Sequence, residues 1–176
     1  KKEIYDLIQQ EYYPKTIIVT PDESLEIILQ KLTSENINFP LIAKPDIGLR
    51  GTAVKKIHTT EELITYHKKA KFNILFQELI PYENEIGLFY VKLPNQSGKI
   101  TGIVSKEFMI ITGNGKNTIR ELLNQDIRYV FQIKALEKEY NDKLNTVLKD
   151  RETINLVPYG NHCRGTKFVD ASHEIT

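Results

Sequence analysis

The chain has 176 residues, 40% of them hydrophobic, which is enough for one domain or two small lobes with a buried core. Its 24 basic and 23 acidic residues leave a net charge of +1, and the absence of a polybasic tract argues against a nucleic-acid or anionic-membrane partner. No apolar run approaches the roughly 20 residues of a membrane helix. The single cysteine, Cys163, excludes an internal disulfide framework, so we expect a cytoplasmic, reducing location.

The beginning of the chain is predicted to alternate helices with strands. Apolar spacing predicts a short helix over about residues 2–11, which Pro14 ends. The β-branched run Thr16–Val19 predicts a strand. A capping box formed by Thr20 and Glu23 is predicted to start the next helix.

Residues 39–45 form the next predicted strand, which carries a lysine, Lys44, just before Pro45 ends it. A short turn containing Gly48 and Gly51 follows. The rest of this half is predicted to form a strand, a capped helix and another strand, at about 54–57, 59–70 and 73–80.

The glycine turn is a candidate anion site. Its glycines allow the backbone to adopt positive φ and to approach a ligand closely, and successive N–H groups in such a turn can bind an anion. Lys44 and Arg50 add charges that suit phosphate oxygens. Taken alone, however, the same stretch is equally compatible with an ordinary hairpin that carries a solvated lysine.

After Pro81 the pattern changes to longer strands and a helical insertion. Two strands are predicted at 86–93 and 99–111, and helical spacing over 118–136 predicts one long helix. A further strand is predicted to end near Val157.

These patterns predict an α/β (α+β) fold with two lobes. Residues 1–80 would form an α/β lobe with the glycine turn, and residues 81–176 an antiparallel lobe with a helical insertion. Small ligands usually bind in a cleft between such lobes.

Two further groups are candidates for binding a ligand. Lys106 is placed on the inner face of its predicted strand, where a lysine needs an anionic partner. The strand end at 77–80 could present backbone groups to an adenine, and Glu78 or Glu85 could accept ribose hydroxyls. Spacing alone favours an ordinary strand end with solvated carboxylates.

The last candidates lie near the C-terminal end. His162, Cys163, Asp170 and His173 match no structural zinc spacing, and an adjacent histidine does not make a cysteine a nucleophile. We therefore predict no metal ligand in this chain. Arg164 is a candidate anion clamp.

Several motifs follow one another in a recognisable order. They are residues 39–45, the glycine turn through Gly51, residues 77–80 with Glu85, residues 112–122, and the Asn-His-Cys-Arg-Gly segment at 161–165. Together they span nearly the whole chain and resemble the ATP-grasp superfamily. Cyanophycin synthetase, D-alanine–D-alanine ligase and a ribosomal-protein glutamate ligase belong to that superfamily.

The resemblance implies a nucleotide site and two catalytic residues. Lys44 would contact the α-phosphate and adenine, the glycine turn would cover the β- and γ-phosphates, and Glu85 would hold the ribose. Lys106 and Arg164 would neutralise the transferring phosphate and the acyl-phosphate. The residues implied to bind the nucleotide are Lys44, Gly48, Arg50, Gly51, Gln77, Glu78, Leu79, Ile80, Glu85 and Lys106.

The resemblance also implies an activity. A carboxylate would attack ATP, and an amine or thiol would then displace phosphate from the acyl-phosphate, a chemistry that depends on positioning and charge neutralisation. The implied cofactors are ATP and Mg²⁺, and the implied substrates are small carboxylates and amines such as amino acids or peptides. The family's magnesium ligands, an acidic residue and then Glu-x-Asn, should follow the arginine segment.

No Glu-x-Asn occurs between Arg164 and Thr176. We therefore expect the magnesium ligands to lie outside this chain, and the chain to be a fragment that is truncated at its C-terminal end. The alternative is a nucleotide-binding or regulatory module without ligase activity. The sequence leaves the acyl substrate, the nucleophile and the oligomeric state open.

Overall fold

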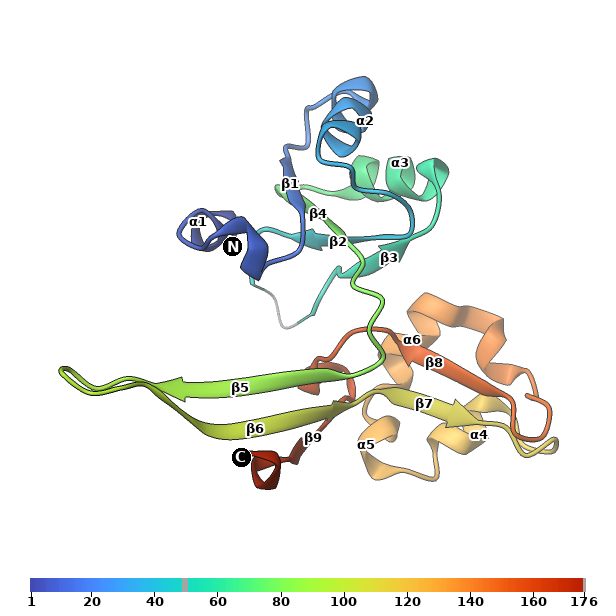
Figure 1. The fold of residues 1–176 in the computed structure, drawn as a ribbon. Coiled ribbons are helices and arrows are strands. Elements are labelled where there is room, and N and C mark those ends of the chain that lie inside the picture. The colour runs from blue at the N-terminus through green and yellow to red at the C-terminus, as the bar shows by residue number, and fades with distance from the viewer. Residues whose placement is uncertain (49–50, 176) are drawn as a thin grey trace. The chain divides into compact units, whose positions relative to one another are not determined.

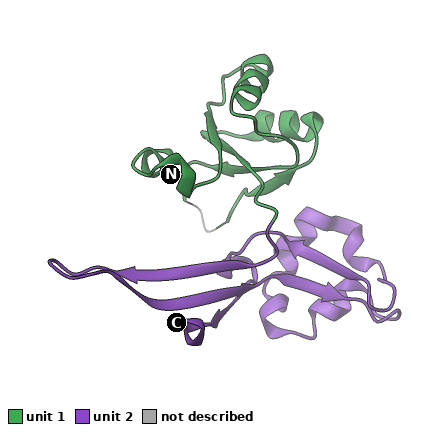
Figure 2. Ribbon diagram, in the orientation of Figure 1, with its two compact units in different colours: residues 1–81 green, residues 82–176 purple. Residues whose placement is uncertain are grey.

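The computed structural model describes residues 1–48 and 51–175, and Figure 1 shows the order of the elements. The chain divides into two compact units, unit 1 (Lys1–Pro81) and unit 2 (Tyr82–Thr176), which Figure 2 distinguishes by colour. Helices and antiparallel sheets occur in both units, so the fold class is α+β, as predicted. No helix in the described part of the chain has the length and apolarity needed to cross a membrane.

Unit 1 is built on a four-stranded antiparallel sheet. Its strands are β1 (Thr16–Val19), β2 (Leu41–Pro45), β3 (Lys55–Ile57) and β4 (Ile74–Glu78), in the spatial order β1-β4-β2-β3. Two helices, α2 (Leu25–Ser34) and α3 (Thr60–Lys69), contribute Ile28 and Leu63 to the core that also buries Phe76 of the sheet. The helices therefore cover one face of the sheet.

Strand alternation places Lys44 on the other face of this sheet. Along β2, Leu41, Ala43 and Pro45 are buried, whereas Ile42 and Lys44 are half-buried between them. The partner of Ile42 on β4 is Gln77, which therefore shares this second face. The position of Lys44 follows directly from the period of two along the strand.

The N-terminal segment differs from the predicted helix over 2–11. Helix α1 (Lys2–Tyr5) is short, and a 3₁₀ turn, η1 (Gln10–Tyr12), follows after a gap. Ile4 and Leu7, which suggested an amphipathic helix, are 60% and 88% exposed. A short helix is marginal without tertiary packing, and this apolar stripe has no core beneath it.

Unit 2 contains two antiparallel sheets and several short helices. One sheet has the order β5-β6-β9, from β5 (Glu85–Val91), β6 (Lys99–Glu107) and β9 (Lys167–Asp170), and the other pairs β7 (Met109–Thr112) with β8 (Thr153–Val157). The helices are α4 (Ile119–Leu123), α5 (Ile127–Val130) and α6 (Ile133–Tyr140), and the 3₁₀ turns are η2 (Asn141–Asn145), η3 (His162–Arg164) and η4 (Ser172–Glu174).

Two predictions of long elements in unit 2 are wrong. The strand predicted over 99–111 is interrupted at Phe108, where the chain leaves β6 and enters β7 of the other sheet. The helix predicted over 118–136 is divided into three helices. The carboxylate of Asp126 caps α5 by accepting the N–H of Arg128 at 2.8 Å, which restarts the helix in a new direction.

The capping predictions have different outcomes. The Thr118–Glu121 capping box is confirmed, and the Thr59 side chain caps α3 by accepting the N–H of Glu62. The prediction for Thr20 and Glu23 is wrong, because Ser24 caps α2 instead. Glu23 does accept the N–H of Thr20 at 2.9 Å, but this contact closes the turn that precedes the helix.

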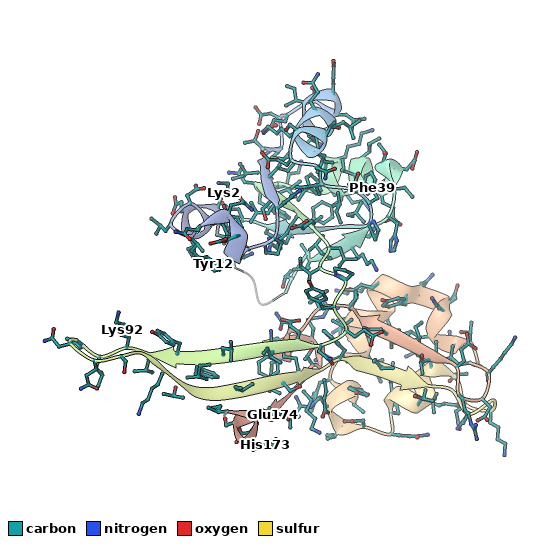
Figure 3. The ribbon with its side chains drawn as sticks, in the orientation of Figure 1. Lys2, Tyr12, Phe39, Lys92, His173 and Glu174 are labelled. Atoms are coloured by element: carbon teal, nitrogen blue, oxygen red, sulfur yellow. The ribbon has the colours of Figure 1, made fainter. Side chains whose placement is uncertain are left out.

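Strands β5 and β6 form a long hairpin (Figure 1). Apolar side chains of β5 are exposed on both of its faces. The exposed fractions of Ile86, Leu88, Phe89 and Tyr90 lie between 54% and 63%. Lys92 lies near the end of this hairpin, as Figure 3 shows. Among the described residues, the outer edge of β5 pairs with no other strand.

Candidate functional site

Lys44 is the centre of a polar cluster on the second face of the unit 1 sheet. Its Nζ donates to Gln77 Oε1 at 2.7 Å and to the Tyr5 hydroxyl at 3.0 Å, and it lies 5.5 Å from the Tyr5 ring centroid. Gln77 is buried, and its Nε2 donates to Thr16 Oγ1 at 2.6 Å. These partners are neutral. Within residues 1–48 and 51–175, the Lys44 ammonium forms no ion pair with a carboxylate.

The positive charge of this cluster affects its neighbours. The Tyr5 ring stacks on Tyr13, with the centroids 4.8 Å apart. Burial opposes ionisation of Tyr5, but hydrogen bonds from Lys44 and Gln77 and the charges of Lys44 and Lys1 outweigh it, so the pKa of Tyr5 is lowered. Burial, and then the charge of Lys44, lower the pKa of Lys1. The contribution of Lys44 to both shifts indicates a positive charge that favours an anion on this face.

The glycine turn is described only in part. Leu49 and Arg50 lie outside the described residues. Gly51 has a φ of +80°, a conformation that favours glycine, whereas Gly48 is not in the left-handed region. Gly48 is exposed, and a Cβ at this position would have no atom within 4 Å. A ligand could therefore approach the backbone of Gly48.

The end of β4 is partly engaged within unit 1. The N–H of Glu78 donates to the Lys15 carbonyl at 3.0 Å, and Glu78 Oε1 accepts the N–H of Lys15 at 2.7 Å. The N–H of Glu78 is therefore engaged within unit 1. The next two amides, of Leu79 and Ile80, form no hydrogen bond within the described part of the chain. Ile80 is 44% exposed.

Glu85 and Lys106 form a second cluster, in unit 2. They are direct partners across the β5–β6 hairpin, and the Glu85 carboxylate forms an ion pair with the Lys106 ammonium. Glu85 Oε2 also accepts the N–H of Gly160 at 2.9 Å. Lys106 Nζ lies 5.6 Å from the ring centroid of Phe168, its partner on β9. The anionic partner that an inward lysine needs is thus supplied by Glu85.

Gly160 packs closely against this ion pair. A Cβ at residue 160 would overlap the carboxylate of Glu85 and the Cδ of Lys106. The ion pair is only partly screened from solvent, since the side chains of Lys106 and Glu85 are 18% and 41% exposed. A residue larger than glycine at position 160 would displace one of the two charged groups.

Arg164 lies in a separate ion pair of unit 2. Its Nη2 donates to Glu139 Oε1 at 2.7 Å, while its buried Nε has no hydrogen-bond partner among the described residues. Burial disfavours the charge, but Glu139 and the nearby Tyr159 and Tyr140 outweigh it, and the pKa of Arg164 is raised. Asn161 shapes this segment, because its Oδ1 accepts the N–H of Cys163 at 2.9 Å.

The structure therefore brings some predicted residues together and separates others. Lys44 contacts Gln77, and Glu85 contacts Lys106, but Arg164 pairs with Glu139 rather than joining the Lys106 cluster. Sequence reasoning missed the residues that complete these clusters, which are Tyr5, Thr16, Glu139, Gly160 and Phe168. Their local sequence carries no signal, since each acts through a partner that is distant in the chain.

The acidic side chains near Lys106 and Arg164 are engaged in contacts within unit 2. No group of three or more His, Cys, Asp or Glu side chains in the described part of the chain could hold a metal ion. Asp170, the first acidic residue after Arg164, accepts the N–H of Ser172 at 2.9 Å. Magnesium bound to a nucleotide is usually held by one or two carboxylates together with phosphate oxygens and water. The carboxylates that surround Lys106 and Arg164 are both occupied by those cations.

Comparison with solved structures shows distant similarity, whereas two other comparisons find no match. No protein-family model and no curated protein matches the chain. Among solved structures, the chain is similar to a bifunctional glutathione synthetase from Pasteurella multocida, with a TM-score of 0.36 and 12% sequence identity. The match covers 93% of this chain and 24% of that one, so the chain spans about a quarter of the length of the synthetase. At this TM-score, the similarity does not establish a family.

Proposed function

We propose that the chain is the ATP-binding part of an ATP-grasp ligase that joins a carboxylate to an amine or a thiol through an acyl-phosphate. The observation that carries this proposal is the environment of Lys44. Among the described residues its half-buried ammonium has neutral partners only, and the glycine turn follows it in the chain. A half-buried cation without a counter-ion favours an anion, and phosphate oxygens accept charge-assisted hydrogen bonds from lysine.

In this proposal the residues of unit 1 hold the phosphates and the base. Lys44 binds the α-phosphate, and the turn from Gly48 to Gly51, including Arg50, covers the β- and γ-phosphates. Gln77 and Glu78 position the end of β4, and the unengaged amides of Leu79 and Ile80 supply donors for the edge of the adenine. The positive potential around Tyr5 supports the assignment of the phosphates to this face.

In unit 2 the proposed roles require two ion pairs to open. Glu85 would bind the ribose hydroxyls and Lys106 the transferring phosphate, so each would exchange its present partner for the nucleotide. Arg164 would likewise leave Glu139 to neutralise the acyl-phosphate. A phosphate would compensate each cation for the lost carboxylate, because phosphate oxygens accept charge-assisted hydrogen bonds from lysine and arginine.

A second candidate function is a nucleotide-binding or regulatory module without ligase activity. The ion pairs that engage Lys106 and Arg164 favour it, because phosphoryl transfer needs cations that are available to neutralise the moving charge. Both candidates share the Lys44 site. They differ in whether ADP is released when magnesium and amino-acid or peptide carboxylates are added.

The test of the shared site is calorimetry with ATP on the 176-residue chain. Lys44→Ala should reduce the affinity by roughly 1.5–3 kcal/mol, the range for a hydrogen bond to a charged group, which is about tenfold or more. Lys68→Ala is the matched control, since Lys68 is exposed on α3, away from the Lys44 face. An affinity that is unchanged by Lys44→Ala, or lowered equally by both variants, would overturn the assignment.

A further inference from the structure

A pocket of about 290 Å³ lies on unit 1, between helix α3 and the segment that leads into β3. Its walls include Ala53, Lys55, Thr65, Tyr66, Lys69 and Phe72, none of which belongs to the proposed nucleotide site. Its volume is near the lower end of the range for small-molecule sites. The space equals that of about ten water molecules at ~30 Å³ each, so it admits one ring with a short side chain but not a nucleotide.

A hydrogen bond joins two of the residues that line the pocket. The Tyr66 hydroxyl donates to the Ala53 carbonyl at 2.5 Å, and the Tyr66 ring packs edge-on against Phe76 of the core. Burial raises the pKa of Tyr66 to about 12, so the hydroxyl remains a donor at neutral pH. Tyr66 therefore ties the pocket to the core of unit 1.

Ala53 adopts a strained backbone conformation at this wall. Its φ is +58°, in the left-handed region that is uncommon for a residue with a Cβ. Such strain persists only where the surroundings hold it, and it is found preferentially at ligand-binding positions. The Ala53 carbonyl accepts the hydrogen bond from Tyr66, so this contact supports the left-handed conformation.

The charges at the pocket all have the same sign. Lys55 and Lys69 are exposed, and within the described residues neither forms an ion pair. No acidic residue lines the pocket. Tyr66, Ala70 and Phe72 supply apolar surface between the two lysines. An apolar interior with a cationic rim is complementary to a ligand that has an apolar body and one negative charge.

We propose that this pocket binds a small organic monoanion, a carboxylate that carries one aromatic ring or a short aliphatic chain. The apolar body lies against Tyr66 and Phe72, and the carboxylate contacts Lys55 and Lys69. The site is independent of the nucleotide site, so it can be tested without ATP.

The probe is phenylacetate, titrated into the ¹⁵N-labelled 176-residue chain and followed by amide chemical shifts at constant ionic strength. We expect a dissociation constant on the order of 1 mM, as the ligand-efficiency range predicts for so few atoms, with shifts confined to residues 53–55 and 65–72. Phenylacetamide, which has the same ring but no charge, should bind at least threefold more weakly.

Matched variants distinguish the contribution of the lysine charges to binding from that of the apolar cavity. Lys55→Gln and Lys69→Gln should each weaken phenylacetate binding by roughly two- to fivefold, as expected for a partly exposed ion pair, while leaving phenylacetamide binding unchanged. Lys68→Gln, which changes the exposed neighbour of Lys69 on α3, should change neither. Thr65→Phe, which fills the pocket, should abolish the binding of both probes.

Three results would overturn the proposal. The first is an absence of shifts at the pocket residues, and the second is equal affinity for phenylacetate and phenylacetamide. The third is an equal loss of phenylacetate affinity in Lys68→Gln and Lys69→Gln. Unchanged amide spectra outside the pocket would verify that each variant is folded, so a loss of binding can be assigned to the pocket itself.

Discussion

The close packing of Gly160 against Glu85 and Lys106 predicts a large effect from one added methyl group. In Gly160→Ala, the new Cβ would overlap the Glu85 carboxylate and the Lys106 Cδ. The backbone of Gly160 is outside the left-handed region, so alanine adds no backbone strain of its own. Any loss of stability therefore reports on the contact with the ion pair.

The size of the stability loss in Gly160→Ala depends on which atoms can move. The overlapped groups lie at the ends of flexible side chains, so we expect them to swing aside rather than distort the sheet. That movement breaks the hydrogen bond from the Gly160 N–H to Glu85 Oε2, which is 2.9 Å long. Hydrogen bonds to charged groups contribute roughly 1.5–3 kcal/mol, and the 41% exposure of Glu85 favours the lower end, about 1.5 kcal/mol.

The assay is urea unfolding followed by circular dichroism. Gly87→Ala is the matched control, because Gly87 lies in β5 and a Cβ there would have no atom within 4 Å. It should be neutral or stabilising by up to about 1 kcal/mol, since glycine is unfavourable in a strand. In a Glu85→Ala background the carboxylate is absent, so adding Gly160→Ala should cost less than about 0.5 kcal/mol.

Two outcomes would refute this reasoning. One is an equal effect of Gly160→Ala and Gly87→Ala on the free energy of unfolding. The other is a cost of Gly160→Ala that persists undiminished when Glu85 is alanine. Either result would show that the loss of stability does not come from the contact with Glu85.

Two other predictions concern Tyr66 and Thr118. Burial raises the pKa of folded Tyr66 to about 12, above its unfolded value near 10, so its contribution to stability is complete below about pH 10 and is lost as the pH rises toward 12. In Tyr66→Phe, the free energy of unfolding measured with urea should fall less steeply over this pH range. An equally steep fall would contradict the prediction. Thr118→Ala removes a capping box and should lower the free energy of unfolding by about 1 kcal/mol, whereas Thr20→Ala removes no cap and should cost less than about 0.5 kcal/mol. Equal losses in these two variants would show that the capping box contributes nothing.

The sequence predicted elements well where a local pattern agreed with tertiary packing. The strand β1 and the helix α3 combine a strong local signal with side chains that enter one core. The helix over 2–11 had the spacing but no core to pack against. The helix over 118–136 had continuous spacing, but Asp126 offered a new cap that interrupts it.

The candidate site was predictable in part. The period of two along β2 predicts that Lys44 lies on the opposite face of the sheet from Leu41 and Ala43. Its partners Tyr5 and Gln77 are 39 and 33 residues away, and only the folded sheet brings them to it. Likewise, Glu85 was a candidate ribose acceptor. Its ion pair with Lys106 could not be predicted, because it depends on the register of the hairpin.

The exposed hairpin of unit 2 affects how the protein behaves at high concentration. Residues 86–91 combine high β propensity with no charge and no proline, which is the composition of segments that stack into cross-β assemblies. An unpaired strand edge offers such a segment as a template for another chain. Lys92 follows this segment in the chain, and Lys99 pairs with Val91 at its end. Charged flanking residues of this kind slow intermolecular stacking. High ionic strength, which screens these lysines, should therefore be the condition under which preparations of the protein aggregate most readily.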